Sequence, residues 1–155
     1  MQKTILAILL FTTSVAVADD QSEAEAKVRE YFDVFNSQDV ERIVETVYSV
    51  PVHIGNSSGH RAYVTEHDAR SGLTTLFGQI EDQGWVRSVI SEVKPCSIAN
   101  GLVFAEVTYT RQKSDGSAIA PGTRRNVYVL QNLSGGWRIT AFYSQDPTKR
   151  FTCKN

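Results

Sequence analysis

The alternation of hydrophobic and polar residues is clearest in Leu102–Arg111, where it has a period of two. The hydrophobic positions of this stretch are Val103, Ala105, Val107 and Tyr109. Successive side chains of a β-strand point to opposite faces, so the pattern predicts a strand with one buried face. Similar runs lie on both sides of it, separated by turns that contain Asn-Gly, Asp-Gly or Gly-Gly. Four long antiparallel strands are therefore predicted within Trp85–Asp146. They are Trp85–Lys94, which ends at Pro95, then Leu102–Arg111, Arg125–Gln131 and Trp137–Ser144.

The segment before these strands has helical periodicity. Ser22–Asn36 carries an apolar stripe with the spacing i, i+3, i+4, i+7, which predicts a first helix with one buried side. The stripe consists of Val28, Tyr31, Phe32 and Phe35. Asp39 is expected to cap a second helix, Val40–Tyr48, and Thr65 with Asp68 to cap a third that ends near Gly84.

Two short strands are predicted between the second and third helices. They are Val50–Ile54 and His60–Val64, joined by a turn rich in Gly, Asn and Ser. Because proline cannot donate a ladder hydrogen bond, Pro51 restricts the first of them to a sheet edge or to a strand start. The element order is thus helix, helix, short hairpin, helix and four long strands.

The N-terminus has the three parts of a secretory signal. Lys3 precedes the short apolar run Thr4–Phe11, and Ala16-Val17-Ala18 supplies a small-x-small cleavage site. We therefore expect a signal peptide over residues 1–18, a single domain over 19–155, and a periplasmic or secreted protein without a membrane contact after cleavage. A membrane anchor is the alternative, but the apolar run is short for a spanning helix.

Length and charge limit the remaining possibilities. The 155 residues suffice for one domain with a real core, and the formal net charge is −1. Such a balance gives no basic face for a polyanion, so no nucleic-acid partner is expected. In an oxidising compartment Cys96 and Cys153 are candidates for a disulfide that closes a 57-residue loop. Two free thiols are the alternative.

One motif supports a family resemblance. Glu30–Val44 contains an aromatic residue, an Asn and an Asp at spacings similar to those linking the first two helices of the NTF2-like superfamily. That superfamily includes ketosteroid isomerases and SnoaL-type polyketide cyclases. The resemblance implies an α+β cone in which a curved antiparallel sheet of about six strands packs against three N-terminal helices. It also implies an apolar pocket at the cone's mouth and a homodimer through the outer sheet face. The residues expected on that outer face are Phe104, Thr108, Thr110 and Phe142.

The resemblance also suggests candidate site residues. Tyr31 falls at the position of the oxyanion-donating tyrosine of ketosteroid isomerases, and Gly55 at the position of their catalytic carboxylate. Residues 50–59 contain no Asp or Glu, so the base for proton abstraction is missing and isomerase activity is not expected. His53 is the remaining acid–base candidate, since imidazole titrates near neutral pH. The alternatives are a core tyrosine for Tyr31 and a solvated strand residue for His53.

Three further residues are expected at the pocket rim. Tyr109 and Arg111 extend the apolar face of one strand, and Tyr143 extends the face of another. An arginine at a rim can bind the carboxylate of a ligand, whereas the alternative for Arg111 is a surface ion pair with Glu106 or Asp115. No zinc pattern surrounds the three histidines, so neither a metal nor another cofactor is expected.

These observations leave three functional hypotheses. The first is a small, mostly apolar ligand bound in a cone pocket of roughly 300 Å³ or more, without assured catalysis. The second is an isomerase, cyclase or hydratase that uses Tyr31 and His53, which requires both residues to face one cavity. The third is a protein-interaction or accessory role, which a cone packed solid by aromatic side chains favours.

Overall fold

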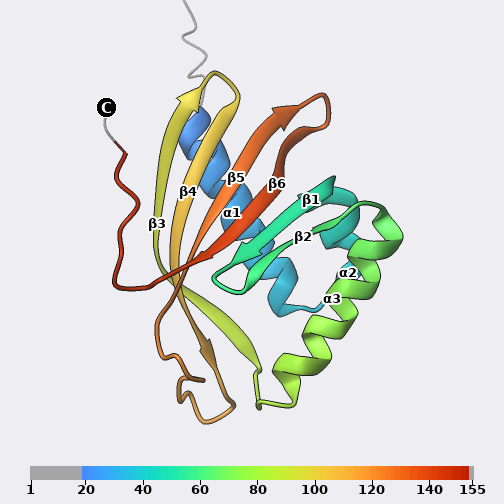
Figure 1. Cartoon of the computed structure of the whole chain (residues 1–155), viewed down its shortest axis with the longest axis vertical. Helices are drawn as coiled ribbons and strands as arrows, with labels where there is room; N and C mark the ends of the chain where they lie inside the picture. Colours follow the sequence, from blue (N-terminus) through green and yellow to red (C-terminus); the bar gives the residue numbers. More distant parts are fainter. Residues whose placement is uncertain (1–18, 154–155) are drawn as a thin grey trace, which may run out of the picture.

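A six-stranded curved sheet forms the body of the protein (Figure 1). The computed structural model describes residues 19–153, so the predicted signal peptide lies outside the described residues. The strands follow the order β2-β1-β6-β5-β4-β3, and every neighbouring pair is antiparallel except β1 with β6, which is parallel. The six strands are β1 (Tyr48–Asn56), β2 (Gly59–Tyr63), β3 (Arg87–Ala99), β4 (Leu102–Gln112), β5 (Arg124–Leu133) and β6 (Gly136–Gln145).

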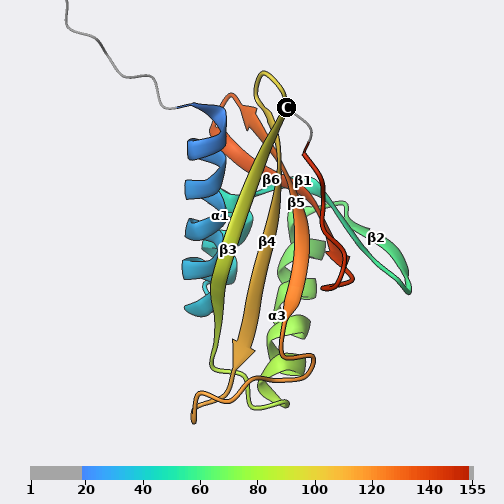
Figure 2. The same ribbon diagram turned by 90° about the vertical axis from the view of Figure 1, so that its left-hand side faces the viewer.

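Helices cover the inner face of this sheet. They are α1 (Asp20–Asn36), α2 (Val40–Arg42), which continues as the π-helical turn η1 (Ile43–Val47), and α3 (Glu66–Glu81). Figure 2 shows α1 lying along one face of the sheet. The predicted apolar stripe of α1 is buried there, and the predicted capping box of Thr65 and Asp68 begins α3. The α+β architecture predicted from the sequence is confirmed, but the sheet is mixed rather than wholly antiparallel, because β1 runs parallel to β6.

Two prolines lie at other places in the sheet than the sequence predicted. The strand that was expected to end at Pro95 continues to Ala99, because β3 is an edge strand and needs hydrogen bonds on one side only. Conversely, β1 lies between β2 and β6 rather than at an edge. Pro51 is accommodated because the β1–β6 register shifts between Tyr48 and His53.

A bulge in β6 reverses the two faces of that strand. Val129 and Leu130 of β5 pair with Ala141 and Ile139, so Thr140 is an extra residue. Beyond the bulge Phe142 lies opposite the buried Tyr128 and packs on its ring. The expectation that Phe142 lies on the outer face is therefore wrong, as is the expectation that Tyr143 continues the inner face.

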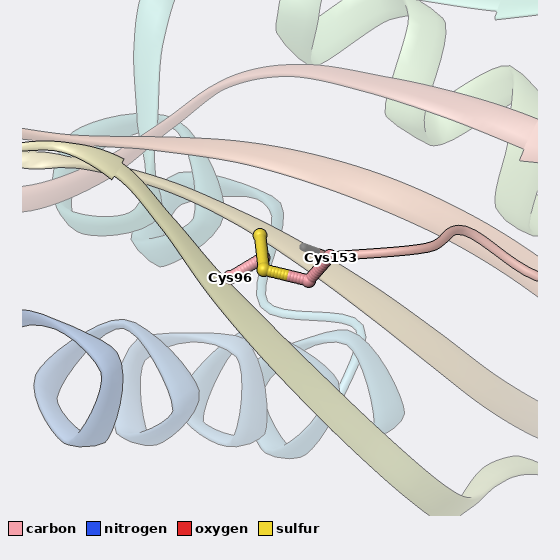
Figure 3. The surroundings of a disulfide bond; sticks show 2 residues. All are labelled: Cys96 and Cys153. Carbon is pink, nitrogen blue, oxygen red and sulfur yellow. A yellow bond between two sulfur atoms is a disulfide. The ribbon is translucent and has the colours of Figure 1, made fainter. Parts of the chain in front are cut away.

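The C-terminal segment crosses the outer face of the sheet, opposite to α1 (Figure 2). A disulfide joins Cys153 to Cys96 on β3, as one of the two alternatives from the sequence had it (Figure 3). Phe151 packs on Phe104, with ring centroids 6.1 Å apart. Part of the surface expected to pair two copies is thus already covered by the chain itself.

Within residues 19–153, no helix is both long enough and apolar enough to span a bilayer.

Candidate functional site: an aromatic cavity at the mouth of the cone

A small cavity lies between α1, α3 and the inner face of the sheet. Its lining comes from these elements and from β3, β4, β5 and β6: Tyr31, Phe32, Phe35, Leu76, Ser88, Tyr109, Arg111, Asn126, Tyr128 and Phe142. Its volume is about 40 Å³. A single buried water needs about 10–15 Å³ on the same measure, so the cavity has room for only a few atoms. This is far below the roughly 300 Å³ expected for a complete ligand.

Aromatic rings fill most of the cone. The Tyr31 ring contacts those of Phe32, Phe35, Tyr48 and Tyr128, with centroids 5.6 to 5.8 Å apart. Most of these pairs are edge-to-face, the geometry that aromatic quadrupoles favour. The sequence places Tyr31 and Phe32 on adjacent positions of α1, so both enter the cone from one turn of the helix.

The phenols of this cluster remain protonated over the physiological range. Burial raises the pKa of Tyr31, Tyr48 and Tyr128, because the interior disfavours a phenolate. The Tyr48 hydroxyl donates to that of Tyr31 at 3.2 Å, and the Asn126 amide donates to the Tyr128 hydroxyl at 3.3 Å. Tyr31 and Tyr128 each keep their own proton to donate to another acceptor.

The motif residue Asn36 fixes the position of α1 against the sheet. Its amide nitrogen donates to the Ser88 carbonyl at 2.9 Å, and its amide oxygen accepts from the Ser88 amide at 2.7 Å. Ser88 in turn accepts a hydrogen bond from the indole of Trp85 at 3.1 Å. This network holds the helix end that carries Tyr31, Phe32 and Phe35 at a fixed height above the cavity.

The cavity brings together three of the five candidate site residues. Tyr31, Tyr109 and Arg111 line it. Arg111 makes no ion pair with Glu106 or Asp115, because Glu106 lies on the other face with Arg125 and Arg150. The surface ion pair considered for Arg111 is therefore wrong.

The other two candidates lie elsewhere. Tyr143 is 43% exposed, because the β6 bulge turns it outward. His53 is exposed and stacks on His60, with the rings 5.5 Å apart, while its neighbour Val52 is buried in the core. Tyr31 and His53 are thus on opposite faces of the sheet, and one substrate cannot reach both.

Sequence reasoning missed Asn126, Tyr128 and Phe142 as lining residues. Asn126 and Tyr128 alternate with outward-facing residues of β5, so the period-two pattern of this strand could have placed them on the inner face. Phe142 could not be found in this way, since nothing in the sequence marks the bulge.

The lining can donate hydrogen bonds but has no group suited to remove a proton from carbon. It contains no Asp, Glu, His, Cys or Lys. Over residues 19–153, no three His, Cys, Asp or Glu side chains are arranged to hold a metal ion. The arrangement is suited to binding an acceptor-bearing molecule.

Solved structures with a similar fold are numerous, and three illustrate the likeness. An NTF2-like protein with a cystatin-like fold from Novosphingobium aromaticivorans matches with a TM-score of 0.64 and 11% identity, over 81% of this chain and 80% of that one. A ketosteroid isomerase-like protein from Erwinia carotovora atroseptica gives 0.60 and 15%, over 84% and 100%. An uncharacterized protein from Caulobacter vibrioides gives 0.62 and 17%, over 84% and 93%. At these identities the likeness concerns the fold alone.

No curated protein matches the sequence. The model of one family, described as NTF2-like protein (DUF6841), matches residues 21–147, which run from the first turn of α1 to beyond the end of β6. The chain therefore belongs to this NTF2-like family, as the motif around Tyr31 and the element order indicated.

Proposed function

We propose that the protein binds a small, largely apolar molecule at the mouth of the cone and does not catalyse a reaction on it. The observation that carries the proposal is the aromatic cavity, whose lining includes the polar-tipped side chains of Tyr31, Tyr109 and Arg111. Because its volume is about 40 Å³, the ligand inserts only a small apolar end. The remainder of the ligand lies outside the cavity, at the open end of the sheet.

A pair of substitutions on α3 tests this proposal. Leu76 lines the cavity, whereas Thr74 is exposed two residues earlier on the same helix. Leu76→Phe should fill the cavity, and Thr74→Phe adds the same ring at the surface. Native mass spectrometry of protein purified from its own source should detect a bound small molecule in the wild type and in Thr74→Phe but not in Leu76→Phe. An absent adduct in the wild type would count against the proposal.

A second candidate is a protein-interaction or accessory role. The cavity size favours it, because nine aromatic side chains leave little free space in the cone. These residues are Tyr31, Phe32, Phe35, Tyr48, Phe77, Trp85, Tyr109, Tyr128 and Phe142. Cross-linking and affinity purification from the source would then recover one stoichiometric protein partner and no small molecule.

We also infer that the protein is exported. Disulfides persist mainly in oxidising compartments, and the Cys96–Cys153 bond together with the signal-like pattern before Asp19 supports export. The mature protein should then begin at Asp19 and show the two-dalton mass decrease of one disulfide. A chain that keeps residues 1–18 in the cytoplasm would contradict this inference.

A further inference from the structure

Two arginines lie side by side at the open end of the inner sheet face. Tyr109 of β4 pairs with Arg124 of β5, so Arg111, two residues further along β4, is the diagonal neighbour of Arg124 on the same face. The two guanidiniums are close enough for the charge of one to change the pKa of the other. Burial lowers the pKa of the Arg124 guanidinium, and the charge of Arg111 lowers it further.

Neither arginine has an acidic partner. Within residues 19–153, no carboxylate lies within the 4.0 Å of an ion pair from Arg111 or Arg124. The Nε atoms of both are buried and have no hydrogen-bond partner. Arg124 donates only from Nη2, to the Ala120 carbonyl at 2.7 Å. A buried donor without an acceptor is costly, and two neighbouring cations increase the cost.

Arg125, the residue after Arg124, is an arginine whose charge and hydrogen-bond donors are satisfied within the fold. Arg125 points to the outer face, where it pairs with Glu106 and donates to two backbone carbonyls. Arg111 and Arg124 on the inner face have no carboxylate partner, and the hydrogen bond from Arg124 to the Ala120 carbonyl leaves both Nε atoms without an acceptor. Arg111 also lines the aromatic cavity. A site that combines two unpaired guanidiniums with an apolar recess matches a ligand with an anionic end and a small apolar end.

We propose that Arg111 and Arg124 bind the carboxylate of a small aromatic or branched organic acid, and that only the edge of its apolar group enters the cavity. The inference rests on the proposed function and specifies the class of ligand. A guanidinium matches a carboxylate through two parallel hydrogen bonds. In a carboxylate, the charged oxygen atoms are bonded to the carbon that carries the apolar group. The apolar group of a carboxylate held by Arg111 therefore lies close to the cavity that Arg111 lines. The Tyr31 and Tyr128 hydroxyls can donate hydrogen bonds to a ligand oxygen atom that lies deeper in the cavity.

Titration with benzoate, benzamide and inorganic phosphate tests the proposal. In proton–nitrogen NMR spectra of the disulfide-bonded protein, benzoate should shift the Nε–H signals of Arg111 and Arg124. Benzamide, which is neutral, should bind at least about tenfold more weakly, since a charge-assisted pair contributes about 1.5–3 kcal/mol. Phosphate should compete poorly, because it has no apolar end.

Substitutions then locate the binding. Arg111→Gln and Arg124→Gln should each weaken benzoate binding about tenfold or more. Arg138→Gln, which removes a charge from a partly exposed arginine of β6, should change it less than about twofold. Arg124→Lys keeps the charge and should bind with intermediate affinity. Removal of one of two facing cations should also leave the melting temperature of the free protein unchanged or higher.

The outcomes separate this inference from the proposed function. Equal binding of benzoate and benzamide, unaffected by the arginine substitutions, would overturn the anion site and leave a neutral ligand in the cone. Equally tight binding of phosphate would overturn the carboxylate. Absence of binding by all three probes, together with no adduct in native mass spectrometry, would contradict both proposals.

Discussion

Glu106 and Arg125 form an ion pair that is buried between the outer face of the sheet and the C-terminal segment. Arg125 Nε lies 3.7 Å from Glu106 Oε1, and the side chains are 5% and 1% exposed. The same carboxylate accepts a hydrogen bond from the Phe151 amide at 2.6 Å, while Arg125 donates to the carbonyls of Pro147 and Lys149. The pair therefore anchors residues 147–151 to the sheet.

Substitution Glu106→Gln should strongly destabilise the protein. It removes the counter-charge of Arg125, which stays buried, so the free energy of unfolding should fall by about 3 kcal/mol. Urea denaturation measures the loss. Glu92→Gln is the matched control, because Glu92 contacts Arg150 at a half-exposed site and its loss should change stability little. If both substitutions lowered the free energy of unfolding equally, the buried ion pair would contribute no more to stability than the exposed one.

Cys153→Ser should release the same segment. Without the bond that closes a 57-residue loop, the unfolded chain regains conformational entropy worth up to about 4 kcal/mol. The Phe151 amide, protected by Glu106, should then exchange with solvent much faster. Hydrogen-exchange mass spectrometry and urea denaturation measure the two effects. Reduction of the wild type should reproduce them, and an unchanged denaturation midpoint would contradict the prediction.

Much of the fold followed from periodicity. The apolar positions that the spacings of 3.6 and 2 indicated in α1 and β4 are buried, because each element packs one side against the core. The same rule placed Tyr109 and Arg111 on the inner face. It failed for Tyr143, since a single bulge residue, Thr140, reverses the faces of β6 without any local sequence signal.

The rest depended on contacts between distant segments. Glu106 alternates as an outward polar residue, yet the C-terminal segment buries it, and no local pattern could reveal that cover. Ile119 lies in the connection between β4 and β5, which contains Gly116, Pro121 and Gly122, residue types that are typical of exposed loops. It is 6% exposed, because its amide binds the Arg111 carbonyl at 2.8 Å and holds the connection against the core. Arg124 was missed for a related reason, since its importance comes from its neighbour on another strand.

The buried tyrosines should make stability depend on alkaline pH. Burial raises the pKa of Tyr31, Tyr48 and Tyr128 above the value of about 10 in the unfolded chain. Because the folded state holds these protons more tightly, their contribution is fully present below pH 10 and is lost as the pH rises above it. Urea denaturation between pH 8 and 11 should show this decline, with a shallower slope in Tyr128→Phe.

Absorbance of phenolate at 295 nm provides the check on that assignment. In the folded protein, part of the signal of the six tyrosines should appear only when the chain unfolds. If all six ionised near pH 10 without unfolding, the tyrosines of the cone would be accessible to solvent and the packed aromatic interior would be wrong.

Two glycines of α3 should respond in opposite ways to the same substitution. Alanine is favoured over glycine in a helix by about 1 kcal/mol, and Gly78 has no atom within 4 Å of the position of an added Cβ. Gly78→Ala should therefore raise the free energy of unfolding. At Gly72 the added Cβ overlaps the ring of Tyr63, which is 6% exposed and cannot move into solvent without leaving the core. Gly72→Ala should lower the free energy of unfolding by about 1–3 kcal/mol, the usual cost of overpacking. Urea denaturation of both variants measures the difference, and a stabilised Gly72→Ala would mean that α3 does not pack closely on β2.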